Sequence, residues 1–127
     1  LDRTRDLQYH YDLARELAFL RKRGVLIIGS GNIVHNLQYA FIDPEKPPYD
    51  WAIEFDALST KAMDERDHYA LINYNKLGKS AELSVNSAEH YIPLLYTLAL
   101  QGENETLTYS NTDFQFRAGS MRCVKVG

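Results

Sequence analysis

The sequence is short of the features that mark several classes of protein. Among its 127 residues there is one cysteine, Cys123, which excludes an intramolecular disulfide framework and a zinc site built from several cysteines. No apolar run approaches the roughly 18–20 residues that a membrane-spanning helix needs, and no signal-peptide pattern opens the chain. We therefore expect a protein of a reducing compartment, the cytoplasm, with no membrane partner.

An excess of positive charge is missing too. Fourteen Lys and Arg stand against seventeen Asp and Glu, whereas a nucleic-acid-binding surface requires a basic excess or stripe, so we expect no nucleic-acid partner. With 45% hydrophobic residues, the chain has the composition of one ordinary domain. It begins with Leu1 and not with Met, and we expect residues 1–127 to be a portion of a longer protein.

Hydrophobic periodicity predicts a mixture of helices and strands. Apolar residues at helical spacing predict a helix over residues 5–23, and Gly24 is placed to end it. The apolar run Val25–Ile28 that follows is typical of a central strand buried on both faces, packed by helices around Leu17 and Leu94. A helix, a tight turn and a buried strand form half of an α/β layer unit, so the predicted fold class is α/β. The other predicted segments are an irregular connection at 38–50, helices at 51–62, 66–75 and 88–100, and strands at 106–109, 114–116 and 121–126.

The residues after the predicted strand have the character of a site. Gly29 and Gly31 flank Ser30 and allow the backbone to approach another segment closely. Sites in open α/β sheets gather beyond the carboxyl ends of strands, and His35 lies at such a position. The glycines form neither the GxSxG elbow of a serine hydrolase nor the GxGxxG motif of a dinucleotide-binding protein.

The other histidines carry weaker signals, because no HExxH metal motif is present. His10 falls within a predicted helix and His68 in a charged run, and we interpret both as surface or hydrogen-bonded core residues. Glu89 and His90 stand side by side at a predicted helix start. A capping glutamate beside a partly exposed histidine is the structural alternative to a functional pair there.

Two segments, taken together, resemble a known family. Residues 30–37 (SGNIVHNL) and 86–96 (NSAEHYIPLLY) resemble the C-terminal half of the class III extradiol ring-opening dioxygenases, in the branch similar to 4,5-DOPA dioxygenase. One departure is Ser87-Ala88, where the family has Thr-Pro before Glu-His. The resemblance implies a three-layer α/β/α domain with a central mixed sheet, of which residues 1–127 are the C-terminal portion.

The resemblance also implies a metal site. Members hold one divalent metal ion, Fe(II) or Zn(II), with two histidine ligands from an N-terminal half that has no counterpart in residues 1–127. His90 matches a further ligand, and Glu89 is the alternative at that place. His35 matches the acid/base histidine beside the metal, with a ligand role as its alternative. Asn32 is expected to contact the substrate.

The function that the resemblance implies is the extradiol opening of a catechol-type, DOPA-like ring with O₂. Fe(II) oxygenases need three protein ligands that leave positions open for substrate and O₂, and a histidine can take up and return a proton near neutral pH. The alternatives are a non-catalytic metal- or protein-binding relative on the same scaffold, and a different metal-binding or hydrolytic enzyme that uses the same histidines. A homo-oligomer stays an open alternative. We expect residues 1–127 by themselves to bind metal weakly and to cleave no ring.

Overall fold

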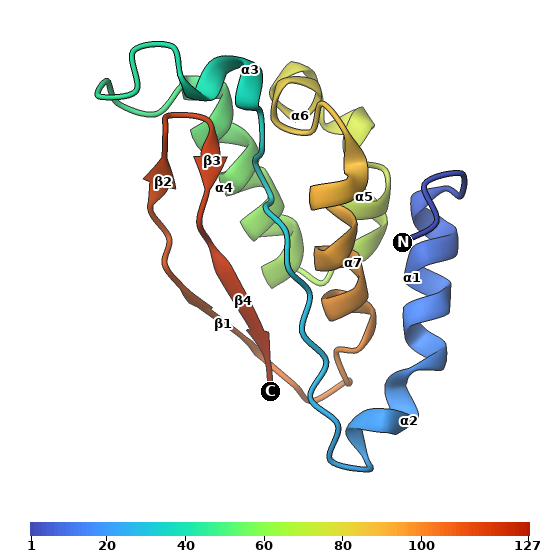
Figure 1. The fold of residues 1–127 in the computed structure, drawn as a ribbon. Helices are drawn as coiled ribbons and strands as arrows, with labels where there is room; N and C mark the ends of the chain where they lie inside the picture. Colours follow the sequence, from blue (N-terminus) through green and yellow to red (C-terminus); the bar gives the residue numbers. More distant parts are fainter.

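A computed structural model describes all of residues 1–127 and shows a mixture of helices and short strands (Figure 1). In chain order the elements are α1 (Leu7–Glu16), α2 (Ala18–Arg21), α3 (Leu37–Ala40), α4 (Asp50–Asp64), α5 (His68–Ile72), the 3-10 helix η1 (Tyr74–Leu77), α6 (Lys79–Ser84), the 3-10 helix η2 (Ala88–His90), α7 (Ile92–Ala99), β1 (Leu107–Ser110), β2 (Phe114–Gln115), β3 (Gly119–Ser120) and β4 (Cys123–Val126). None of the helices combines the length and the apolar character that crossing a bilayer requires.

The strands confirm the α/β class and form two small antiparallel sheets. β1 pairs with β4, with Leu107 opposite Val126, and β2 pairs with β3, with Phe114 opposite Ser120. The predicted strands at 106–109, 114–116 and 121–126 therefore exist with slightly different bounds. The three layers and the central mixed sheet that the resemblance implies remain a prediction about a longer polypeptide.

The helix predicted over residues 5–23 is divided in two. Asp6 caps α1 by accepting a hydrogen bond from the Tyr9 amide at 2.8 Å. α1 ends at Glu16, and α2 starts at Ala18 as a separate turn. Gly24 ends the region as predicted, with φ at +78°, and the Val25 amide turns back to the Leu20 carbonyl at 3.1 Å. The predicted helix at 51–62 is confirmed as α4.

The core lies between α4, α5, α6 and α7. Phe55 and Met63 on α4 pack with Leu71 on α5 and with Leu95 and Leu98 on α7, and all five side chains are fully buried. α1 runs beside α7 (Figure 1) and closes the other side of that helix. This packing fixes α7, and with it the segment that precedes α7.

The prediction that Val25–Ile28 is a buried central strand is wrong for this chain. The run is extended but belongs to no strand, and Leu26 and Ile28 are 80% and 79% exposed. Residues 26–31 make no backbone–backbone hydrogen bond. The run passes between α7 and β4 (Figure 1), so it is covered in part, but no strand pairs with it. A continuous apolar run is buried on both faces only where a neighbour covers each face.

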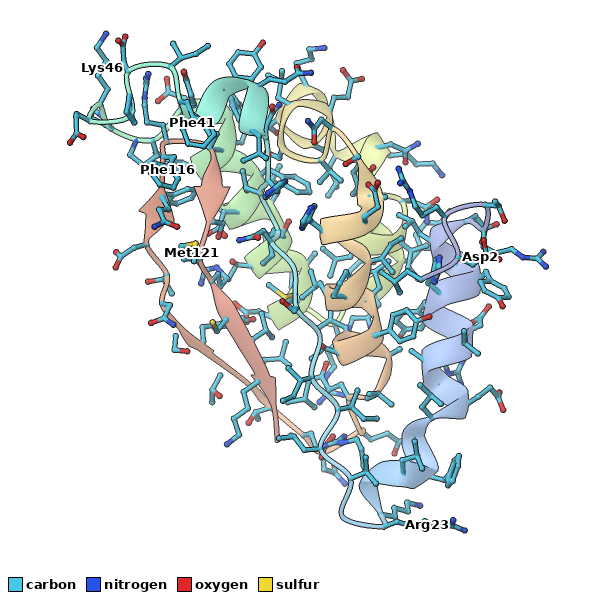
Figure 2. The ribbon with its side chains drawn as sticks, in the orientation of Figure 1. Asp2, Arg23, Phe41, Lys46, Phe116 and Met121 are labelled. Carbon is cyan, nitrogen blue, oxygen red and sulfur yellow. The ribbon has the colours of Figure 1, made fainter.

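Two exposed phenylalanine side chains lie together at the turn between β2 and β3. Phe41, just after α3, and Phe116, in the turn between β2 and β3, are 64% and 46% exposed, and their rings lie 5.4 Å apart (Figure 2). This contact ties the predicted irregular connection at 38–50, whose first residues form α3, to the β2–β3 turn.

Candidate active site

His35 and His90, which stand far apart in the sequence, meet in the structure. Their rings stack with centroids 4.0 Å apart and planes inclined by 23°. His35 is half-buried and His90 is exposed, so one side of the pair faces solvent. The structure thus brings together the two histidines that the sequence singled out.

The backbone of His35 is held from both sides. Its amide donates to the Ser84 carbonyl at 2.9 Å, and it forms one isolated β-bridge with Val85 and another with Gly119. The next residue, Asn36, caps α3 through its side-chain oxygen and donates to the Leu83 carbonyl at 2.6 Å. The backbone of His35 is therefore held in place between the end of α6 and β3.

His90 sits at the point where η2 leads into α7. The helix predicted over 88–100 begins with a 3-10 turn, and α7 starts at Ile92 with Pro93 in its first turn, a position that proline favours. Tyr91 anchors the junction because its buried hydroxyl donates to the Leu71 carbonyl at 3.0 Å. Glu89 forms an ion pair with Arg3, whereas His90 stacks on His35. This arrangement favours His90 over Glu89 as the functional member of that pair.

The predicted close approach at the glycines is confirmed, and the partner is the start of α7. A Cβ at Gly31 would lie 2.1 Å from the His90 carbonyl oxygen, and one at Gly29 would lie 2.6 Å from the Pro93 carbonyl oxygen. Real Cβ atoms essentially never come so close to another heavy atom. Only glycine lets the two histidine segments lie against each other.

Asn32 joins three parts of the site. Its amide donates to the His90 carbonyl at 2.8 Å, and its side-chain Nδ2 donates to the Ser120 carbonyl at 2.8 Å. The same nitrogen lies 3.9 Å from the sulfur of Met121, which Figure 2 labels between β3 and β4. The contact of Asn32 with a substrate stays a prediction.

A groove of about 380 Å³ opens beside His90. It runs between the extended segment, the first turns of α7 and β4, and its volume falls in the range of small-molecule sites. Its lining residues are Ile28–Ile33, His90, Pro93, Leu94, Thr97 and Arg122–Val124.

The electrostatics of the pair favour a neutral His35. Partial burial lowers the pKa of His35 below its usual value, and the neighbouring His90 lowers it further because two imidazolium charges would repel. A neutral imidazole carries the lone pair that either accepts a proton or binds a metal ion.

The pair has the donor type of a metal site but not a full set of ligands. Imidazole nitrogens are suitable ligands for both Fe(II) and Zn(II). No group of three or more His, Cys, Asp or Glu side chains in residues 1–127 could hold a metal ion. His35 and His90 therefore fit part of the ligand set.

The other two histidines have structural partners, as predicted. His10 is fully buried between α1 and α7, with Nδ1 3.2 Å from the Tyr96 hydroxyl and Nε2 3.0 Å from the Asp2 carbonyl. His68 is hydrogen-bonded through Nδ1 to the Tyr11 hydroxyl at 2.6 Å. Neither approaches the His35–His90 pair closely enough to stack or bond with it.

One polar cluster beside the site was missed from the sequence. Asp56 on α4 is 3% exposed and binds both Ser120 and Arg122. A signal was present, since Asp56 occupies a position next to Phe55 on the buried side of a predicted amphipathic helix, where a carboxylate needs partners.

The α/β fold and the meeting of His35 with His90 agree with what the resemblance implies, and comparison with known proteins confirms the resemblance. The chain is 30% identical to the 4,5-DOPA dioxygenase extradiol of Escherichia coli (strain K12), a match that covers 100% of this chain and 48% of that protein. It is 35% identical to the protein of the same name from Mirabilis jalapa, over 80% of this chain and 38% of that protein.

A solved structure agrees. The crystal structure of an uncharacterized protein from Escherichia coli K12 superposes with a TM-score of 0.89 at 30% identity, over 100% of this chain and 53% of that one. No protein-family model matches the chain. Homologues named 4,5-DOPA dioxygenase extradiol thus cover this chain, which spans about half the length of the curated relatives it matches.

Proposed function

We propose that this chain is part of a metal-dependent extradiol dioxygenase that opens a catechol-type, DOPA-like ring with O₂. The observation that carries the proposal is the stacking of His35 on His90, which itself lines a groove, in a chain whose homologues bear that name. The remaining metal ligands would come from polypeptide outside residues 1–127.

His90 would hold the metal ion, because it is exposed at the rim of the groove and its backbone is anchored by Asn32 and by buried Tyr91. An Fe(II) ion bound there would supply the open positions at which the catechol oxygens and O₂ are brought together. Zn(II) would fit the same donors without supplying redox chemistry.

His35 would be the acid/base. Its lowered pKa keeps the imidazole neutral near neutral pH, so the ring nitrogen can accept a proton from a catechol hydroxyl and later return it. The two β-bridges on either side of His35 fix its backbone, which is what a group that transfers a proton over one hydrogen-bond length requires. Asn32, at the groove wall, would orient the substrate with the free oxygen of its side chain.

The test compares two variants in the natural polypeptide that carries this sequence. His90→Ala should lower metal content and oxygen uptake with a catechol together. His35→Ala should keep most of the metal and still bind the catechol, yet lose turnover by about 10²–10⁴-fold, the usual effect of a positioned proton-transfer group. His68→Gln is the matched control, since it removes an imidazole away from the pair.

Near-normal metal content and activity in both variants would overturn the proposal and favour a non-catalytic relative. Equal loss of metal in both variants would make His35 a ligand and remove its separate role in proton transfer.

A further inference from the structure

A buried ion pair between Asp56 and Arg122 contacts β3, the strand next to the segment that carries His35. The Arg122 Nε–H is shared between the two carboxylate oxygens of Asp56, each 3.1 Å from the nitrogen, and Nη2 donates to Oδ2 at 2.6 Å. The side chains are 5% and 14% exposed, so water competes little for either charge. The Arg122 guanidinium also lies over the Tyr109 ring, 5.4 Å from its centroid.

Ser120 connects this ion pair to β3. Its hydroxyl donates to Asp56 Oδ1 at 2.6 Å and accepts from the Arg122 amide at 3.4 Å. Ser120 is 1% exposed. The three side chains thus close a ring of contacts that fixes the backbone of residues 120–122 against α4.

The backbone of Ser120 in turn fixes the site segment. Its amide donates to the Val34 carbonyl at 3.1 Å, and its carbonyl accepts from Asn32 Nδ2 at 2.8 Å. These two bonds hold Asn32 and Val34, which precede His35 in the chain. His35 itself forms a β-bridge with Gly119, the neighbour of Ser120.

We infer that Asp56 is a positioning residue, which acts through Ser120 and Arg122 to set the placement of the His35 ring against His90. The expected effect of Asp56 on turnover rests on the proposed function, whereas its expected effect on the placement of the histidine rings does not. Asp56 has no contact with either histidine and is not itself catalytic.

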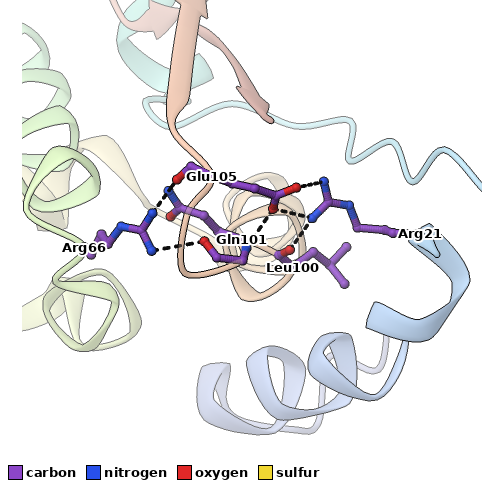
Figure 3. Close-up of polar contacts among 6 residues, drawn as sticks. Arg21, Arg66, Leu100, Gln101 and Glu105 are labelled. Carbon is purple, nitrogen blue, oxygen red and sulfur yellow. Dashed lines mark hydrogen bonds and ion pairs between the residues drawn. The ribbon is translucent and has the colours of Figure 1, made fainter.

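A second ion pair provides a matched control. Glu105 accepts two hydrogen bonds from Arg21, at 2.6 and 2.7 Å, and it ties the end of α7 to α2 without touching the site (Figure 3). Arg66 donates to the carbonyls of Gly102 and Glu105 in the same cluster (Figure 3). Glu105→Gln therefore breaks a carboxylate–guanidinium fork of the same type away from His35.

The first measurement is spectroscopic and needs no activity. In the metal-free natural polypeptide with isotope-labelled histidine, the stacked rings shift each other's ring protons upfield, and His35→Ala and His90→Ala assign the signals. Asp56→Asn should remove most of this upfield shift, and Ser120→Ala should remove a part of it while keeping the ion pair. Glu105→Gln should leave it unchanged.

If Asp56→Asn does not fold, Ser120→Ala decides, because it deletes only one hydroxyl. Unchanged ring-proton shifts in the folded variants would overturn the inference. Equal changes in Glu105→Gln would overturn it too, since the effect would then be one of general stability.

The second measurement is turnover in the same polypeptide. Asp56→Asn should lower kcat about 10- to 100-fold, because a displacement of about 1 Å at a reacting group costs on that order. Glu105→Gln should keep kcat within about twofold of the wild type, as expected for a site it does not touch. A wild-type protein that opens no catechol would refute the proposed function, while the ring-proton shifts would still test the positioning role.

Discussion

Gly31→Ala tests the contact on which the histidine site depends. The new Cβ would start 2.1 Å from the His90 carbonyl oxygen. An ordinary C···O contact is about 3.3 Å or longer, so the two segments must separate by roughly 1 Å. That movement would stretch the 2.8 Å hydrogen bond from the Asn32 amide to the same carbonyl and would slide the His35 ring off His90.

The loss in the free energy of unfolding is the sum of three contributions. Overpacking costs about 1–3 kcal/mol, and the weakened hydrogen bond costs about 1 kcal/mol. Replacing glycine stiffens the unfolded chain and returns about 0.4–1 kcal/mol. The net loss in the free energy of unfolding is about 1–4 kcal/mol, which for a domain of this size lowers Tm by roughly 4–13 °C.

Urea unfolding and the histidine ring-proton shifts provide the assay. Gly24→Ala is the control, because its Cβ meets no atom within 4 Å while its φ of +78° disfavours alanine. This control should cost about 1–2 kcal/mol and leave the histidine signals in place. The reasoning fails if Gly31→Ala costs no more than Gly24→Ala, or if the His35–His90 signals survive it.

Two further predictions concern stability. Hydrogen bonds from Arg21 and from the Gly102 amide hold the pKa of Glu105 at about 2, below its usual 4.5, so its contribution to stability is present above pH 4.5 and is lost as the pH falls toward 2. Glu105→Gln should therefore flatten the acid limb of a Tm-against-pH curve, and an unchanged slope between pH 5 and 2 would contradict the assignment. Tyr91→Phe leaves the buried Leu71 carbonyl without its donor and should cost about 1–3 kcal/mol in urea unfolding, whereas a cost near zero would show that water replaces the hydroxyl.

Local signals in the sequence predicted much of what positions the site. The capping glycine Gly24, the helix around Phe55 and the close approach of Gly31 all follow from the properties of single residues or of one periodic segment. The meeting of His35 and His90 was expected from the resemblance, because periodicity says nothing about which distant segments lie together.

Contacts between distant elements explain the rest. The run Val25–Ile28 has the side chains of a buried strand, but burial depends on neighbours that supply hydrogen bonds and cover, and residues 1–127 supply only part of both. The ion pair of Asp56 with Arg122 joins residues from α4 and from the turn before β4, so no spacing rule along one element could reveal it.

The unpaired backbone of residues 26–28 has an expected consequence for how the protein behaves at high concentration. Unpaired amides and carbonyls beside exposed Leu26 and Ile28 are a template on which another extended chain can add. Two molecules that meet along this edge would satisfy each other's hydrogen bonds and bury each other's apolar side chains. We therefore expect the stretch around Leu26 and Ile28 to favour edge-to-edge association between molecules as the concentration rises.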